Sequence, residues 1–533
     1  MKTAVVALAS ALALTACAGV DSSPKATTDP TAIVTLNGTE PQKPLIPTDT
    51  NEAGGRRIVN AVFAGLLTYS ADGESVNDVA DSITTDDSQH FVVTIAGDRV
   101  FSNGERVTAR SFVDAWNFAA RKSNAQLTSS FFADIRGFSY DEDTELTGLT
   151  VVSDTRFTID LSAPVSDFPL RLGHSAFFPM PTVAYTDMEA FGENPIGNGP
   201  YMLAAANTWK HDESIELVAN PSYAGPRVPK NGGLRYVFYA SYEAAYADLL
   251  SRTLDVLDVI PDSKIASYLD DLDGRGVNQR SAAFQAFGIP ASLEHFAGEE
   301  GRLRRQAISM AIDRAEITAV IYKGTRVPAK DFSSPTTGSW SATLPGSEVL
   351  EHNPKKAKQL WAEADRMSPW TGAFRIAYNA DADHRDWVDA VANSIKNTLQ
   401  IDAAGEPVPT LRQFRTAIVE KSMDSAFRFG LRGDYPGVQN YLGPIYGTRA
   451  AYNDIGYSNP EFDALIEKGL AQTDVAAANA DFDAAQVVLL NDLPAIPLWY
   501  PNVTGGFGES VQHVTFAWNA FPVVDQITKT STR

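Results

Sequence analysis

The feature that most constrains the fold is an alternation of short apolar runs with amphipathic segments along the whole chain. Apolar runs at 215–218, 235–239 and 254–257 have the length of buried strands. An amphipathic segment at 242–250 lies between the last two and has the spacing of a helix. Strands that alternate with helices predict an α/β chain built in layers.

Length and charge bound the class of protein. At 533 residues the chain is too long for one core, and roughly 150 residues per domain predicts about three domains. The formal net charge of −21 argues against a nucleic-acid partner, which requires clustered Lys and Arg, and against docking on anionic lipid by charge. Cys17 is the single cysteine, so the chain can form no internal disulfide and no thiolate-rich metal site.

The first residues have the pattern of an export signal. Lys2 precedes an apolar run at 4–14, about eleven residues, which is too short for a membrane span. Residues 1–16 are therefore expected to be a signal peptide. The run ends in L-T-A-C at 14–17, which resembles the bacterial lipobox and implies acylation of Cys17. Residues 17–31, rich in Ser, Thr, Asp and Pro, then form a tether.

The stretch 427–441 is the strongest candidate for ligand contact. Aromatic residues alternate with other types at 427–430, as in a half-buried strand, and Gly and Pro at 433–437 end that pattern. We expect a strand edge that pairs with an extended ligand, with Asp434 holding a cationic group at its end. The alternative is a surface turn in which Asp434 caps its own backbone.

Other elements follow from periodicity and from capping residues. Gly and Pro are densest at 194–201, which predicts a crossing between domains. Strands are predicted at 33–36, 91–95, 374–378 and 494–500, and helices at 56–69, 111–121 (capped by Thr108), 302–321, 355–364, 387–399, 460–470 and 476–490.

Seven short motifs occur along the chain in a fixed order. They are F-A-G-L-L at 63–67, F-S-N-G-E-R-V-T-A at 101–109, G-N-G-P-Y at 197–201, N-P-S-Y at 220–223, R-Q-A-I-S-M-A-I-D-R at 305–314, Y-S-N-P-E-F-D at 457–463 and P-A-I-P-L at 494–498. Together, behind a lipobox, they resemble the extracytoplasmic solute-binding proteins of peptide ABC importers, the oligopeptide- and dipeptide-binding family. The resemblance covers nearly all of the mature chain.

This resemblance implies a two-lobed α/β fold of the type II periplasmic-binding-protein kind, with an additional domain and hinge closure over the ligand. The implied boundaries are lobe I at 32–71, 200–283 and 503–533, the additional domain at 72–199, and lobe II at 284–502.

The resemblance also implies roles for individual residues. Asp434 would anchor the peptide ammonium group. The other implied ligand-binding residues are Gly430, Leu431 and Arg432 (peptide backbone), Arg428 and His384 (peptide carboxylate), and Asn51, Glu52 and Ala53 (a loop facing the ligand). Family members often carry Trp where this chain has Leu431, and L-D-P where it has L-I-P at 45–47; the continuation at 437–439 differs as well. These departures concern pocket shape and ligand length.

The expected function is therefore capture of short peptides for an ABC permease, by a monomer anchored through Cys17 to the extracytoplasmic face of the membrane. We expect no enzyme activity, cofactor, metal or nucleic acid. The acidic clusters at 141–143 and 381–383 do not continue into a calcium-loop pattern. The alternatives are the same fold binding a nickel chelate, haem, glutathione or a sugar, a secreted hydrolase, and an inert surface lipoprotein or adhesin. The chain contains neither G-x-S-x-G nor H-E-x-x-H, which disfavours the hydrolase.

Overall fold

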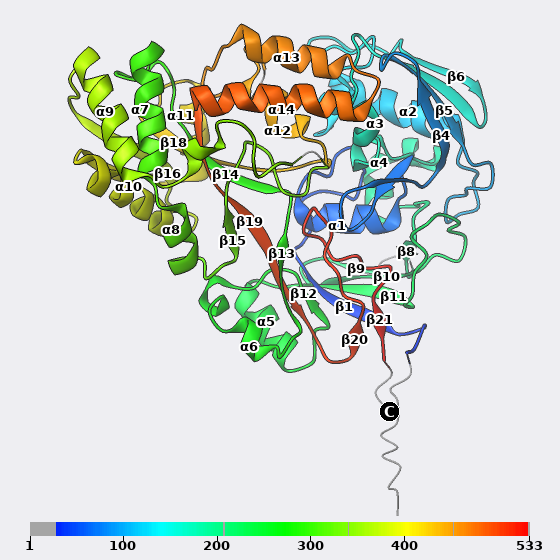
Figure 1. Ribbon diagram of the computed structural model, residues 1–533. Coiled ribbons are helices and arrows are strands. Elements are labelled where there is room, and N and C mark those ends of the chain that lie inside the picture. Colours follow the sequence, from blue (N-terminus) through cyan, green and yellow to red (C-terminus); the bar gives the residue numbers. More distant parts are fainter. Residues whose placement is uncertain (1–27, 206–207, 339, 451, 531–533) are drawn as a thin grey trace, which may run out of the picture.

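A 13-stranded mixed sheet runs through most of the molecule (Figure 1). The computed structural model describes residues 28–205, 208–338, 340–450 and 452–530; the expected signal peptide and Cys17 lie outside them. The strand order is β17 (Asp402–Val408), β16 (Ala373–Asn379), β18 (Ala426–Arg432), β14 (Ala283–Gly288), β19 (Ala495–Phe507), β12 (Val256–Leu257), β1 (Ile33–Gly38), β11 (Gly233–Phe238), β10 (Ser214–Ala219) and β8 (Tyr201–Leu203).

The long strand β19 joins the two lobes of this sheet. Its first part pairs antiparallel with β14, where Gly288 lies opposite Ala495. Its last part pairs with β12 and with β13 (Gly276–Arg280), where Gly276 lies opposite Gly506. The chain also passes from one lobe to the other between β13 and β14. The lobes are thus connected through the sheet itself, by β19 and by residues 281–282.

Lobe I is the half of the sheet that contains β1 and β8 to β13. In it β1 runs parallel to β11, and β10 pairs antiparallel with β11 and with β9 (Trp209–Lys210). Two helices pack beside β12, and a short C-terminal hairpin lies below β1 (Figure 1). These elements are α5 (Tyr242–Leu250), α6 (Tyr268–Asp271), β20 (Val511–Gln512) and β21 (Thr528–Lys529).

Lobe II is the half with β14 to β18, in which β16 runs parallel to β17 and to β18. Helices pack around the sheet, with α7 on α9 and α13 on α14 (Figure 1). Its remaining elements are α7 (Gly298–Ala311), α8 (Arg314–Val320), β15 (Arg326–Pro328), α9 (Pro354–Met367), α10 (Arg385–Leu399), α11 (Leu411–Val419), α12 (Gln439–Tyr446), α13 (Pro460–Leu470) and α14 (Val475–Asp492). One continuous apolar core, drawn from residues between 284 and 500, fills this lobe.

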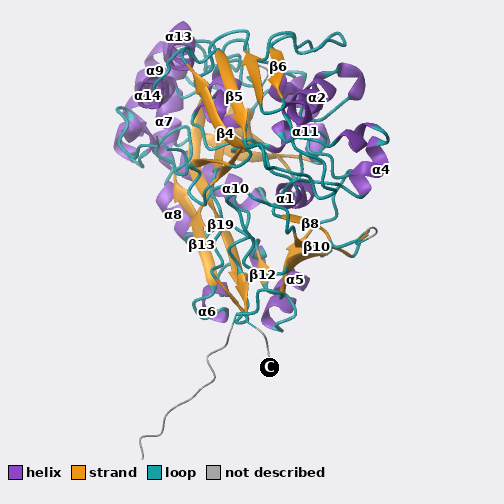
Figure 2. Cartoon of the chain, turned by 90° about the vertical axis from the view of Figure 1, so that its right-hand side faces the viewer, coloured by secondary structure: helices purple, strands orange, loops and turns teal. Residues whose placement is uncertain are grey.

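A separate four-stranded antiparallel sheet, β4-β5-β7-β6, forms the small-sheet domain (Figure 2). Trp116 of α2 is fully buried against it and stands edge-on to Phe157. Thr108 caps α2 in a capping box with Ser111, as predicted. Helix α1 (Ala53–Val62) packs on β8 and belongs to lobe I, and β2 (Leu67–Tyr69) follows it. The elements of the small-sheet domain are β3 (Ser75–Asn77), β4 (Ala80–Thr85), β5 (His90–Ile95), α2 (Ala109–Ala120), β6 (Leu149–Ser153), β7 (Arg156–Asp160), α3 (Phe168–Arg171) and α4 (Met188–Glu193). Its apolar core is continuous with that of lobe I.

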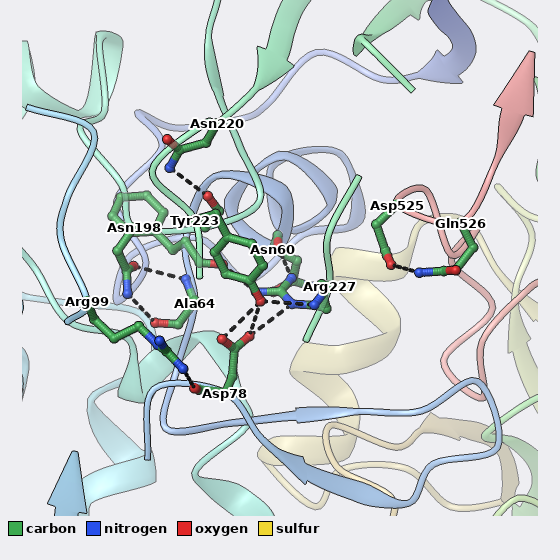
Figure 3. A network of polar contacts seen from close by, with 12 residues as sticks. Asn60, Ala64, Asp78, Arg99, Asn198, Asn220, Tyr223, Arg227, Asp525 and Gln526 are labelled. Carbon is green, nitrogen blue, oxygen red and sulfur yellow. Dashed lines mark hydrogen bonds and ion pairs between the residues drawn. The ribbon is translucent and has the colours of Figure 1, made fainter. Parts of the chain in front are cut away.

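The predicted helix at 56–69 is wrong in its second half. The helix ends at Val62, and Leu67–Tyr69 form the strand β2, which pairs with β3. Both backbone groups of Ala64 bind the side chain of Asn198 instead of a helical neighbour, at 3.0 and 2.9 Å (Figure 3). A contact with a residue far along the chain therefore replaces the helix that the local pattern favours.

The predicted helix at 302–321 is divided into α7 and α8. Ile312 is extended, and Asp313 caps α8 by accepting from the amide of Glu316 at 2.9 Å. The buried guanidinium of Arg314 binds the carbonyls of Ser309 (2.9 Å) and Pro497 (2.8 Å), which holds the bend.

The G-N-G-P-Y segment packs directly on the end of α1. A Cβ on Gly197 would lie 2.0 Å from the carbonyl oxygen of Val62, so this close approach requires glycine. The amide of Gly199 donates to the same carbonyl at 2.8 Å. Among the residues searched, those that the structure describes, no helix has the length and apolarity needed to cross a bilayer.

Candidate ligand-binding site

Asp434 lies just beyond β18, in a turn that its neighbours hold in place. The amide of Gly433 donates to the carbonyl of Ala282 at 2.8 Å, and the hydroxyl of Tyr441 donates to the same oxygen at 2.9 Å. A Cβ on Gly433 would lie 2.6 Å from that hydroxyl, so a larger residue could not take this place without a shift. The turn thus fixes Asp434 beside the chain crossing at 281–282.

Tyr435 anchors the same turn to the small-sheet domain. Its buried hydroxyl donates to Asp167 Oδ2 at 2.7 Å. Asp167 also binds Arg171 at 2.9 Å, and that guanidinium lies 5.5 Å from the centroid of the Tyr435 ring. Burial raises the pKa of Tyr435 well above its usual range, so the phenol stays protonated and donates. Asp434 therefore sits where lobe II meets the small-sheet domain.

Lobe I faces Asp434 with a cation. Arg56 Nη1 of α1 lies 3.4 Å from Asp434 Oδ1. Burial raises the pKa of Asp434, and the charge of Arg56 opposes that rise. Although protein surrounds it, the Asp434 side chain keeps 44% of its surface exposed, because it borders open cavities on two sides. The carboxylate is therefore accessible to a small ligand from between the lobes.

Two cavities meet at Asp434. The first has a volume of about 140 Å³ and lies between α1, β2, the loop at 173–178 and the C-terminal segment at 517–525. The second has a volume of about 330 Å³ and lies between β18, α12 and the segment at 452–455. Gly430, Leu431 and Arg432 line the second cavity together with Asp434.

One edge of β18 is open beside this second cavity. Along its other edge, β14 pairs with it from Phe427 to Arg432. On the open side, β16 pairs with it only at Ala426 and Phe427, and no strand in the described part of the chain pairs with 428–432 there. Among the described residues, a Cβ on Gly430 would have one neighbour within 4 Å, at 3.4 Å, so the face of the sheet toward which it points is also uncovered there. Extended backbone can add to such an edge.

Arg428 and His384 lie at the far end of this edge. Arg428 donates to Asn379, and its guanidinium lies 5.1 Å from the centroid of the Phe414 ring. Burial, with the charges of Arg428 and Arg326, lowers the pKa of His384 to about 4. The imidazole is thus neutral at pH 7, and its Nδ1 accepts from the indole of Trp387 at 3.2 Å. A positive charge at this end of the strand edge would therefore come from Arg428 and Arg326.

The segment 51–53 opens α1 and lies outside the lining of both cavities. Asn51 is exposed and Ala53 is the first helical residue. Glu52 caps the helix by accepting from the amides of Gly54 (2.6 Å) and Gly55 (2.7 Å). This cap holds the helical turn that carries Arg56. In the part of the chain that the structure describes, no group of three or more His, Cys, Asp or Glu residues could hold a metal ion.

Sequence reasoning missed Arg56, although one signal was available. Arg56 and Arg57 stand early in a helix, where the macrodipole disfavours cations. Each therefore needs an acidic partner from elsewhere: Asp434 for Arg56 at 3.4 Å, and Asp258 for Arg57 at 2.5 Å.

Two lobes joined through a shared sheet, with cavities that converge on a carboxylate between them, define a solute receptor of the periplasmic-binding-protein class. Residues 74–453 match the model of the bacterial extracellular solute-binding proteins, family 5, and the chain belongs to this family.

Relatives and solved structures agree with this assignment. The dipeptide-binding protein DppE of Bacillus subtilis is 25% identical over 468 residues, covering 83% of this chain and 82% of the relative. The open, unliganded form of the periplasmic murein tripeptide-binding protein MppA has a TM-score of 0.82 at 20% identity, covering 96% of this chain and 99% of that one. Haemophilus influenzae OppA, in complex with RPPGFSPFR, has a TM-score of 0.71 at 20% identity, covering 95% and 100%. At these identities the solved structures establish the two-lobed fold.

Proposed function

We propose that this protein captures short peptides between its lobes and delivers them to an ABC permease. The ammonium group of the peptide binds Asp434, and its backbone adds to the open edge of β18 at Gly430, Leu431 and Arg432. The observation that carries the proposal is an accessible carboxylate at the end of an unpaired strand edge, where a cavity of lobe II meets a cavity lined by lobe I. Main-chain pairing with the first residues and an ion pair at the terminus recognise what all peptides share. The names of the relatives, which bind dipeptides, oligopeptides and a murein tripeptide, support it.

The distance along β18 sets an upper length for the peptide. β18 ends at Arg432, and the six residue steps from Arg428 to Asp434 span at most roughly 20 Å at about 3.4 Å per residue. If Arg428, with His384 beside it, receives the peptide carboxylate, the ligand has at most about six residues.

The wider organisation belongs to the same proposal. We assign 32–71, 200–283 and 503–533 to lobe I, 72–199 to the additional domain and 284–502 to lobe II. The two lobes close over the ligand by bending at the segments where the chain passes between them. The apolar core confined to 284–500 supports the lobe II boundaries. The protein is a monomer without catalytic activity, and Cys17 carries the lipid that anchors it to the outer face of the membrane. Asn51, Glu52 and Ala53 act through the start of α1.

Isothermal titration calorimetry of the purified mature chain tests this function. Unmodified peptides of two to eight residues are titrated, and a nickel chelate, haem, glutathione and a sugar are titrated in parallel. We expect binding of peptides with up to about six residues and weaker binding beyond that length. Binding of the nickel chelate, haem or the sugar, with no peptide binding, would contradict the proposal and leave only the receptor fold.

A further inference from the structure

The first cavity, on the lobe I side of Asp434, contains hydrogen-bond donors that are not used within the described part of the chain. Nε2 of His174, Oγ of Ser175 and Nε of both Arg56 and Arg57 are buried there without a partner among the described residues. His174 and Ser175 are only 4% and 2% exposed. A buried donor without a partner costs about 1–3 kcal/mol, so four such donors around one cavity indicate a ligand group that accepts hydrogen bonds.

The imidazole of His174 is fixed as a neutral donor. Its Nδ1 accepts from the amide of Ala176 at 3.2 Å, so Nε2 carries the proton of the neutral ring. Burial, and then the charge of Arg56, lower the pKa of His174 well below its usual range. The ring stacks on Phe131 with 4.2 Å between centroids, which sets its orientation.

Most other charges that line this cavity have partners of their own. Arg227 binds Asp78 at 3.1 Å (Figure 3). Arg57 binds Asp258 through Nη2 at 2.5 Å, although its Nε has no partner among the described residues. The carboxylate of Asp525 accepts from Gln526 at 2.5 Å and faces the charge of Arg227. Arg56 differs from these, because its partner at 3.4 Å is the carboxylate that we assign to the peptide ammonium.

We propose that the first cavity is an anion subsite for a carboxylate that the first residue of the ligand carries beside its ammonium group. The inference rests on the proposed function and names the class of peptide that the site prefers. On binding, the ammonium takes Asp434, and the carboxylate takes Arg56 with the donors of His174 and Ser175.

The ion pair between the lobes explains the preference. A ligand with both charges gives each member of the Arg56–Asp434 pair a new partner, so no charge stays unpaired between the lobes. A peptide with a neutral first residue takes Asp434 and leaves Arg56 without a counter-ion, which is unfavourable where water is excluded. The cavity of about 140 Å³ is several times larger than one water molecule requires, so it can admit a carboxylate group.

Two kinds of peptide present this chemistry. One begins with a standard Asp or Glu, whose side chain supplies the carboxylate. The other begins with a glutamyl residue linked through its side chain, whose own α-carboxylate stays free next to the ammonium.

Calorimetry with three matched tripeptides tests the subsite: Gln-Ala-Ala, Glu-Ala-Ala and the γ-linked form of Glu-Ala-Ala. For the unmodified protein we expect at least one acidic peptide to bind about tenfold or more tightly than Gln-Ala-Ala. Arg56→Gln should bring that ratio to less than about twofold, and Ser175→Ala should lower it part of the way. Arg110→Gln, at an exposed position of α2, should leave it unchanged. A purely structural role of Arg56 would weaken all three peptides equally.

The outcomes separate the two proposals. Equal binding of all three peptides to the unmodified protein overturns the subsite and leaves peptide capture standing. A ratio that survives Arg56→Gln also overturns the subsite. If no tripeptide binds, the proposed function itself fails. The acidic peptide that binds more tightly identifies which of the two sources the site accepts.

Discussion

Replacing Asp434 by Asn should abolish tight peptide binding while leaving the unliganded protein nearly as stable as before. In the free protein, Asp434 contacts Arg56 at 3.4 Å, and 44% of its side chain is exposed. An ion pair this open contributes about 0–1 kcal/mol. The amide is close in shape to the carboxylate, and Gly433, Tyr435 and Tyr441 hold the turn without it. The unfolding temperature should therefore fall by less than about 3 °C.

In the bound state the same substitution should have a much larger effect. The peptide ammonium would be enclosed between the lobes beside Arg56 without a counter-ion. Removing one partner of an enclosed ion pair costs about 3–5 kcal/mol, because the other charge stays desolvated. The dissociation constant should therefore rise by between about 10²-fold and 10⁴-fold.

Calorimetry with one tripeptide and its N-acetylated form measures this effect directly. Acetylation removes the ammonium charge, so the unmodified protein should lose most of its affinity for the acetylated ligand. The Asn variant should bind both forms weakly and nearly equally. A loss of less than about fivefold for the free peptide, in a variant that melts normally, would refute the assignment of Asp434.

Three further predictions concern stability. Burial raises the pKa of Asp331 to about 6, so the free energy of unfolding falls as pH rises from about 4 through 6. Asp331→Asn should remove about 2 kcal/mol of the fall between pH 4 and 7.5, measured by urea unfolding, and an unchanged pH dependence would contradict this. Tyr435→Phe leaves Asp167 with Arg171 alone and should lower the free energy of unfolding by about 1–3 kcal/mol in thermal denaturation. The control Tyr140→Phe changes a side chain that is 63% exposed and should leave that free energy unchanged. Gly197→Ala should lower the free energy of unfolding by about 1–3 kcal/mol or more, because its Cβ would lie 2.0 Å from Val62. In the control Gly97→Ala the nearest atom lies 3.7 Å from the new Cβ, so the change should stay within about 0.5 kcal/mol. Equal melting of the two variants would show that the contact at Gly197 can relax.

Local periodicity predicted elements whose ends coincide with local signals. The predicted helices at 242–250 and 460–470 match α5 and α13 residue for residue, since Ser241 and Asn459 supply their caps. The prediction went wrong where a distant contact decided the backbone. At Ala64 the side chain of Asn198 ends the helix, although the apolar spacing continues to residue 67. No window of neighbouring residues contains that contact.

The candidate site likewise has parts that a local pattern predicts and parts that depend on contacts between distant residues. A strand that runs into a Gly and Pro turn is a local pattern, so an open edge and an acidic residue at its end could be expected from residues 427–437 alone. Arg56 is 378 residues from Asp434, so their contact depends on how α1 packs against the turn after β18. His174 and Ser175 come from a third segment, in the small-sheet domain. The role proposed for them depends on atoms that have no partner among the described residues, which only the packed structure reveals.

Ligand binding and lobe closure are coupled through the residues that meet at Asp434. Asp434 belongs to lobe II and Arg56 to lobe I, while Tyr435 connects the same turn to Asp167 in the small-sheet domain. A ligand that bridges Asp434 and Arg56 therefore contacts both lobes at the point where the third unit also meets them. Because a ligand shifts a conformational equilibrium only by its difference in affinity for the two states, these bridging contacts are the ones able to favour the closed form. Peptide contacts made with β18 alone stay within lobe II and add affinity equally to the open and closed forms.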